Sequence, residues 1–175
     1  MIDLSRNHFE LFGLPARFAV PADAIERSYH EIQGRVHPDR YADATDAERR
    51  TAMQWATHVN EAYATLREPL KRARYLLALR GVDPQIETNT AMPAEFLTAQ
   101  MEWREAVEEA ALAADVDALD HLLARLRRDT HAEFDALGRE LDEGRDAEAA
   151  ASVRRLMFYE KIQEDIGHAI VAAEG

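Results

Sequence analysis

Apolar side chains recur at helical spacing along almost the whole chain, and no stretch shows the alternation that is typical of a β-strand. Between positions 22 and 36 one stripe of a helix is formed by Ile25, Tyr29, Ile32 and Val36. A second stripe follows downstream and consists of Ala52, Ala56, Val59, Tyr63 and Leu66. These patterns predict an all-α fold.

Proline and glycine divide the helical pattern into seven segments. A short helix over residues 8–12 is expected to end at Gly13-Leu14-Pro15. The third helix should begin after a polar loop, with Asp46 as its N-cap and Arg49 where a capping box would have glutamate. The other predicted helices span residues 22–36, 69 to about 80, 93–114, 117–143 and 146–173.

The last three helical segments are long and belong together. The middle one carries a heptad-like apolar face made of Leu119, Leu122, Leu123, Leu126, Phe134, Leu137 and Leu141. Long helices joined by short turns pack antiparallel, so we predict a three-helix bundle. Turn-forming residues between Gly81 and Met92 indicate a linker. The predicted organisation is therefore one module over residues 1–80, a linker over 81–92 and a second module over 93–175.

The composition describes an ordinary globular protein, with 47% hydrophobic and 31% charged residues in a chain of 175. No apolar run approaches the roughly 20 residues that a membrane span requires, and the first residues lack the pattern of a signal peptide. We therefore expect a cytoplasmic protein without a membrane partner. The absence of cysteine excludes disulfides, thiolate zinc sites and cysteine ligands for an iron–sulfur cluster.

Negative charge is concentrated in the second half of the chain. Residues 1–80 hold 12 Lys/Arg and 11 Asp/Glu, whereas residues 81–175 hold 9 and 22, so net charges of +1 and −13 combine to −12. A strongly acidic half repels nucleic acid and anionic membranes, so neither is expected as a partner. The asymmetry also favours two modules with different partners.

A tripeptide, His37-Pro38-Asp39, directly follows the helix predicted over residues 22–36. Pro38 disfavours helical backbone at the preceding residue, so the helix should end there and display an imidazole and a carboxylate on a loop. The next predicted helix contains the run Asn60-Glu61-Ala62-Tyr63-Ala64-Thr65-Leu66. This combination of helix, loop and second helix resembles the J-domain family.

The resemblance implies a co-chaperone of a DnaK-type ATPase. In J-domains this loop and the helix before it contact the ATPase chaperone and stimulate its ATP hydrolysis. The positions that carry over as chaperone-binding residues are His37, Pro38 and Asp39, together with Arg27, His30, Arg35 and Arg40 on the basic face. Glu26 and Glu31 dilute that face, which hints at a specialised chaperone partner.

Alternatives to this interpretation are weaker. Without its flanking helices the tripeptide would be only a helix stop with an Asp-type turn. A hydrolase that uses His37 and Asp39 lacks an activated serine or cysteine and a glycine-rich phosphate loop. A purely structural helical adaptor is the third possibility. The remaining histidines show no paired helical spacing such as i, i+4, so we expect them at the surface or at caps and not as metal ligands; they are His8, His30, His58, His121, His131 and His168. We predict no bound metal, no cofactor and no enzymatic activity.

Two further segments, FELFGLPAR at residues 9–17 and RARYLLALRG at residues 72–81, look like the HscB family, as does the acidic three-helix module. HscB proteins are J-type co-chaperones of bacterial iron–sulfur cluster assembly. The resemblance covers essentially the whole chain. It implies binding of an IscU-like scaffold protein and its delivery to an HscA-like chaperone. A J-protein that serves a different client is the alternative.

Candidate scaffold-binding residues are apolar positions that leave the core stripes. Leu97 and Met101 fall roughly 100–140° from Phe96 around their helix. Phe158 lies roughly 100° from the core stripe of the last helix. We therefore expect three exposed apolar side chains ringed by charge, as partner sites usually are. The HscB resemblance implies the same positions, with a rim of Thr98, Glu102, Arg104 and Glu105.

Overall fold

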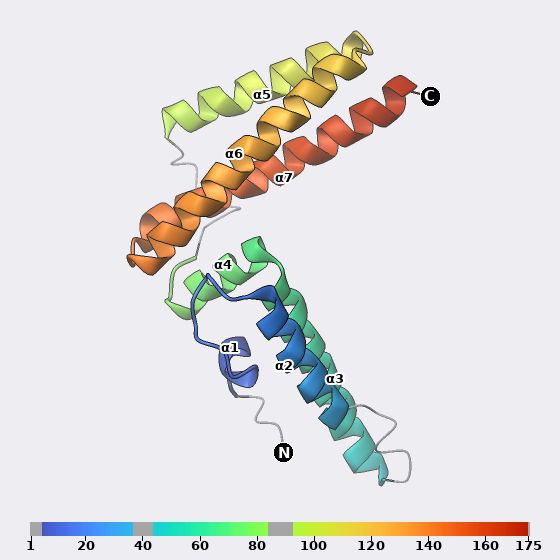
Figure 1. The fold of residues 1–175 in the computed structure, drawn as a ribbon, viewed down its shortest axis with the longest axis vertical. Coiled ribbons are helices and arrows are strands. Elements are labelled where there is room, and N and C mark those ends of the chain that lie inside the picture. Colours follow the sequence, from blue (N-terminus) through green and yellow to red (C-terminus); the bar gives the residue numbers. More distant parts are fainter. Residues whose placement is uncertain (1–4, 37–43, 84–92, 175) are drawn as a thin grey trace. The chain divides into compact units, whose positions relative to one another are not determined.

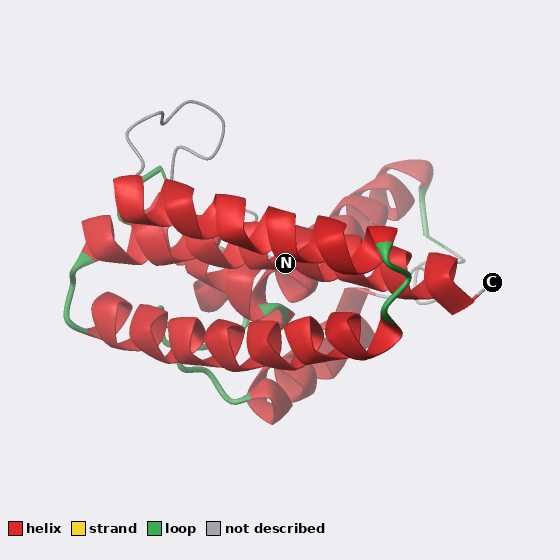
Figure 2. Ribbon diagram, turned by 90° about the horizontal axis from the view of Figure 1, so that it is seen from above, coloured by secondary structure: helices red, strands yellow, loops and turns green. Residues whose placement is uncertain are grey.

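The computed structural model describes residues 5–36, 44–83 and 93–174. Within these ranges Figure 2 shows only helices and loops, so the predicted all-α fold is confirmed. His37, Pro38, Asp39 and Arg40 lie outside the described residues, as does most of the predicted linker. The chain divides into two compact units, Met1–Gly81 and Val82–Gly175.

The first unit contains four helices: α1 (His8–Leu11), α2 (Ala22–Val36), α3 (Asp46–Arg67) and α4 (Pro69–Leu79). In Figure 1, α2 and α3 lie side by side as an antiparallel hairpin, and α1 and α4 both contact α3. The two predicted stripes face each other across this hairpin. The fully buried side chains of the first unit include Phe9, Ile25, Val36, Ala52, Val59, Ala62, Leu66, Ala73 and Leu77.

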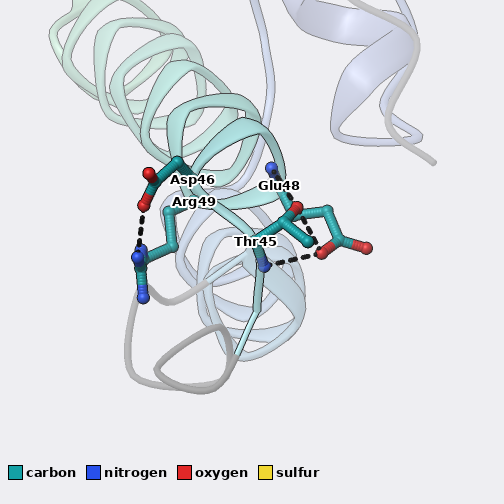
Figure 3. Close-up of polar contacts among 4 residues, drawn as sticks. All are labelled: Thr45, Asp46, Glu48 and Arg49. Carbon is teal, nitrogen blue, oxygen red and sulfur yellow. Dashed lines mark hydrogen bonds and ion pairs between the residues drawn. The ribbon is translucent and has the colours of Figure 1, made fainter.

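The start of α3 corrects one expectation, because Thr45 and not Asp46 is the N-cap. Thr45 Oγ1 accepts a hydrogen bond from the Glu48 amide at 3.3 Å, and the Glu48 carboxylate accepts from the Thr45 amide at 2.9 Å. Asp46 is the first helical residue and pairs with Arg49 (Figure 3). The N-cap therefore lies one residue earlier than predicted and is part of a capping box that was not predicted, which satisfies two amides that the helix cannot.

The second unit is the predicted antiparallel three-helix bundle. It consists of α5 (Ala94–Leu112), α6 (Val116–Asp142) and α7 (Asp146–Glu174), and each helix contacts the other two (Figure 1). One apolar cluster of its core is formed by Phe96, Trp103, Val107, Ala110, Leu119, Leu126, Phe158, Ile162 and Ile166. Further buried apolar residues join α6 to α7; they are Leu137, Leu141, Ala149, Val153 and Leu156. All three helices contribute side chains to the apolar cluster, so the packing of their apolar faces is what stabilises the bundle.

The two turns of this bundle have the same backbone form but different residues at the critical position. After α6, Gly144 adopts φ 72° and Arg145 N–H donates to the Glu140 carbonyl at 2.8 Å. After α5, Ala114 adopts φ 49° and Asp115 N–H donates to the Ala110 carbonyl at 3.0 Å. Alanine rarely takes a left-handed conformation, which is why the sequence predicted α5 to continue through Ala114.

Candidate functional sites

The predicted chaperone-contact residues that the structure describes are Arg27, His30 and Arg35, and all three lie exposed on α2. Arg27 pairs with Asp23 and Arg35 pairs with Glu31 at 2.6 Å, in each case one helical turn away. A hydrogen bond from Arg27 holds the pKa of the Asp23 carboxyl below its ordinary value. Because both arginines have a carboxylate beside them, α2 presents paired charges and not a uniformly basic face.

An aromatic contact fixes α2 against α3 and thereby orients the hairpin. The rings of Tyr29 and Tyr63 stack with 4.1 Å between their centroids. The Tyr29 hydroxyl donates to Asn60 Oδ1 at 3.0 Å and accepts from Gln33 Nε2 at 3.0 Å. The sequence placed both tyrosines on apolar stripes, but periodicity gave no sign of these hydrogen bonds. The contact therefore joins the middle of α2 to the C-terminal part of α3.

Residue spacing did not reveal that His8, His58 and Tyr75 contact one another in the first unit. His8 stacks on Tyr75 with 4.3 Å between ring centroids, and the edge of His58 approaches it at 5.5 Å. Neither His8 Nδ1 nor His58 Nε2, both buried, has a hydrogen-bond partner among the described residues. Burial lowers the pKa of His8, and the neighbouring His58 lowers it further, while Glu61 opposes the shift. The expectation that these two histidines lie at the surface or at caps was wrong, since both are half-buried.

On α5, two of the predicted scaffold-binding residues are exposed apolar side chains. Leu97 is 46% exposed and Met101, one helical turn further, is 61% exposed. The four predicted rim residues around them are also exposed; they are Thr98, Glu102, Arg104 and Glu105. The Thr98 hydroxyl donates to the Ala94 carbonyl of its own helix at 3.1 Å. An apolar pair bordered by charged side chains is the typical appearance of a protein-binding surface.

Phe158 corrects the expectation of a third exposed apolar residue. Its side chain is only 8% exposed and belongs to the core of the bundle. The ring meets Phe96 edge to face with 5.8 Å between centroids, and the Arg104 guanidinium lies 5.8 Å from its centre. The stripe analysis assumed one buried face on the last helix. Because α7 packs against both α5 and α6, it buries a second face, and Phe158 lies on the face toward α5.

Among the described residues, no group of three or more histidine or carboxylate side chains could hold a metal ion. No described helix is long and apolar enough to pass through a membrane.

Comparison with known proteins decides the family. Residues 92–167 match the family described as the HSCB C-terminal oligomerisation domain. The chain is 55% identical over 174 residues to a co-chaperone protein HscB homolog of Burkholderia multivorans and 54% identical to one of Paraburkholderia xenovorans, with 99% of each chain covered. This chain belongs to the HscB family of co-chaperones.

Solved structures agree with this assignment. The chaperone HscB from Vibrio cholerae matches with a TM-score of 0.84 at 33% identity, covering 96% of this chain and 99% of that one. Human co-chaperone protein HscB matches with a TM-score of 0.88 at 27% identity, covering 95% and 83%. The function expected from the sequence, a J-domain co-chaperone of the iron–sulfur cluster assembly family, is thereby confirmed at the level of the family.

Proposed function

We propose that this chain brings an IscU-like scaffold protein to an HscA-like ATPase chaperone and stimulates ATP hydrolysis by that chaperone. In this proposal the first module, residues 1–80, contacts the chaperone and the module of residues 93–175 holds the scaffold. The protein acts in the cytoplasm, needs no cofactor of its own and performs no catalysis. The iron–sulfur cluster is carried by its client.

The observation that carries the scaffold-binding part is the apolar pair on α5. Leu97 and Met101 are not part of the apolar core cluster of the bundle. Exposing their apolar surface to water is unfavourable in free energy, and a partner that covered them would remove that cost. Glu102 and Glu105 border the pair and favour a scaffold surface with basic residues. Phe158 supports this face from beneath, because the Arg104 side chain lies over its ring.

Titration calorimetry of purified scaffold into this chain tests the proposal. A Leu97→Ala/Met101→Ala variant should bind at least about tenfold more weakly than the wild type, because central apolar residues dominate such interfaces. Leu112→Ala is the matched control, since Leu112 is also an exposed leucine of α5 but is not among the proposed contacts. No binding to the wild type would favour a J-protein with a different client.

The chaperone-binding part requires a second assay. His37→Gln should abolish stimulation of the HscA-like ATPase while leaving scaffold binding unchanged, because the two contacts are assigned to different modules. Charge reversal at Arg27 or Arg35 should weaken stimulation only modestly, because each already pairs with a carboxylate on α2. Full stimulation by the His37→Gln protein would instead support a structural adaptor.

A further inference from the structure

The chain contains five methionines and no cysteine, so methionine thioethers are its only sulfur groups. Peroxides oxidise a thioether to the sulfoxide, and the reaction requires contact between the oxidant and the sulfur. Among the described methionines, Met53 is 62% exposed and Met101 is 61% exposed, whereas Met157 is partly buried. Met53 and Met101 are therefore the described methionines that a peroxide reaches most readily.

The two exposed methionines have different surroundings. Met101 lies one helical turn after Leu97 on α5, and the two side chains form the apolar pair of the proposed scaffold site. Met53 lies on α3 in the first unit, and its exposed neighbours one turn away are polar; they are Arg49, Arg50 and Thr57. Oxidation at Met101 therefore alters an apolar contact surface, whereas oxidation at Met53 does not.

Oxidation changes the polarity of the Met101 side chain. The O–O bond of the peroxide breaks, and one oxygen forms a bond to the thioether sulfur. The other oxygen leaves as water if the oxidant is hydrogen peroxide, and the sulfur loses the two electrons that the peroxide gains. The sulfoxide oxygen accepts hydrogen bonds, so burying it against an apolar partner surface without a donor is unfavourable in free energy.

We propose that Met101 is an oxidation-sensitive residue, at which a peroxide forms the sulfoxide and thereby switches off scaffold binding. The switch depends on the proposed scaffold-binding function of the same apolar pair. It leaves the fold intact, because the Met101 side chain is exposed and lies outside the apolar core cluster. It is also reversible, since methionine sulfoxide reductases restore the thioether.

Peptide mapping by mass spectrometry, after mild treatment of the full chain with hydrogen peroxide, locates the added oxygen without any partner present. Met101 and Met53 should be oxidised at least about threefold faster than Met157, because exposure controls access to the sulfur. A Met101 that is oxidised no faster than Met157 would overturn the proposal.

Titration calorimetry with a purified IscU-like scaffold then compares treated and untreated protein. The peroxide is removed before the scaffold is added, so that only this chain is oxidised. The treated wild type should bind about tenfold more weakly than the untreated wild type. Reduction of the treated protein by methionine sulfoxide reductases should restore the affinity, and circular dichroism checks that the fold is unchanged throughout.

Two leucine variants assign the effect to one sulfur. Met101→Leu keeps an apolar side chain of similar volume but cannot form a sulfoxide, so treatment should not change its affinity. Met53→Leu removes the other exposed thioether, and treatment should still weaken its binding about tenfold, as in the wild type.

The untreated protein separates failure of the switch from failure of the scaffold site. If untreated wild type binds and treated wild type binds equally well, the switch is overturned and the scaffold site stands. An equal loss of affinity on treatment of Met101→Leu would also overturn the switch, because the effect would then come from another residue. If untreated wild type does not bind, the proposed scaffold-binding function fails, and the switch fails with it.

Discussion

The two units of this chain differ in the buried polar contacts that hold their helices together. In the first unit a charged side chain is part of the interior: the Arg72 guanidinium donates to the carbonyls of Phe18 at 2.9 Å and Leu66 at 2.6 Å. It also lies 5.2 Å from the centre of the Phe18 ring. In the second unit the buried polar contact joins side chains, from the Ser152 hydroxyl to the Glu140 carboxylate at 2.7 Å.

The difference follows from helix length. The first unit includes helices of 4 and 11 residues, α1 and α4, so more of its backbone lies in loops and at helix ends. The two carbonyls that Arg72 satisfies are of this kind, since Phe18 lies in a loop and Leu66 lies in the last turn of α3. Helices of 27 and 29 residues, as in α6 and α7, satisfy almost all of their own backbone and are joined by apolar faces. A buried charged side chain therefore satisfies backbone carbonyls in the first unit, where it is Arg72, and a side-chain hydroxyl in the second, where it is Glu140.

The largest expected effect is on the free energy of unfolding, and it distinguishes a core residue from surface residues within the proposed scaffold site. Phe158→Ala should lower the free energy of unfolding by about 3–4 kcal/mol, because it leaves a cavity beneath Arg104 and against Phe96. Leu97→Ala/Met101→Ala should change it by less than about 0.5 kcal/mol, since both side chains are exposed. Urea denaturation followed by circular dichroism measures both. Equal effects would show that Phe158 is not a core residue.

In the first unit the corresponding test is Arg72→Ala, with an expected loss of about 2–3 kcal/mol. The substitution leaves the buried Leu66 carbonyl and the Phe18 carbonyl without their charged donor. Arg74→Ala removes an exposed arginine of the same helix and should cost less than about 0.5 kcal/mol.

Amide hydrogen exchange in α3 and α4 measures the loss of stability in the Arg72→Ala and Arg74→Ala variants. Because Arg72 reaches two carbonyls at once, Arg72→Lys should restore only part of the stability. Full restoration by lysine would mean that a single donor is sufficient and that the planar fork of the guanidinium is not required.

Helix positions were predictable because proline and glycine mark their ends. Pro69 opens α4 and Gly144 follows α6, and the predicted bounds agree with the structure within one or two residues. The error at Ala114 has a physical cause, since nothing in the sequence distinguishes an alanine in a left-handed turn from one in a helix. The correct N-cap of α3 does have a sequence signal, because Glu48 lies three residues after Thr45, as a capping box requires.

The candidate site was predictable only in part. Leu97 and Met101 could be identified as exposed because α5 has one dominant buried face. Phe158 could not be placed correctly, because periodicity reports how apolar residues are spaced around a helix but not how many neighbours that helix has.

Substitutions at the two turns of the second unit should change the free energy of unfolding by smaller amounts, upward at one turn and downward at the other. Ala114→Gly should raise the free energy of unfolding by about 0.5–1 kcal/mol, because glycine adopts the positive φ of that position without steric cost. Gly144→Ala should lower it by about 1 kcal/mol for the same reason. Denaturation midpoints of the two variants measure the effects. No gain from Ala114→Gly would mean that the greater freedom of glycine in the unfolded chain offsets the relief of strain.

The smallest effect concerns pH and belongs to the first unit alone. Burial and the neighbouring His58 hold the pKa of His8 below its ordinary 6.5, so the unfolded chain binds the proton more readily than the folded unit does. The resulting stability is complete above pH 6.5 and is lost as the pH falls below that value toward the folded pKa. His8→Phe keeps a ring against Tyr75 but removes the titration, so its denaturation midpoint should decline less between about pH 7.5 and about pH 5.5 than that of the wild type. An unchanged slope in the variant would mean that the acid sensitivity of this unit does not come from His8.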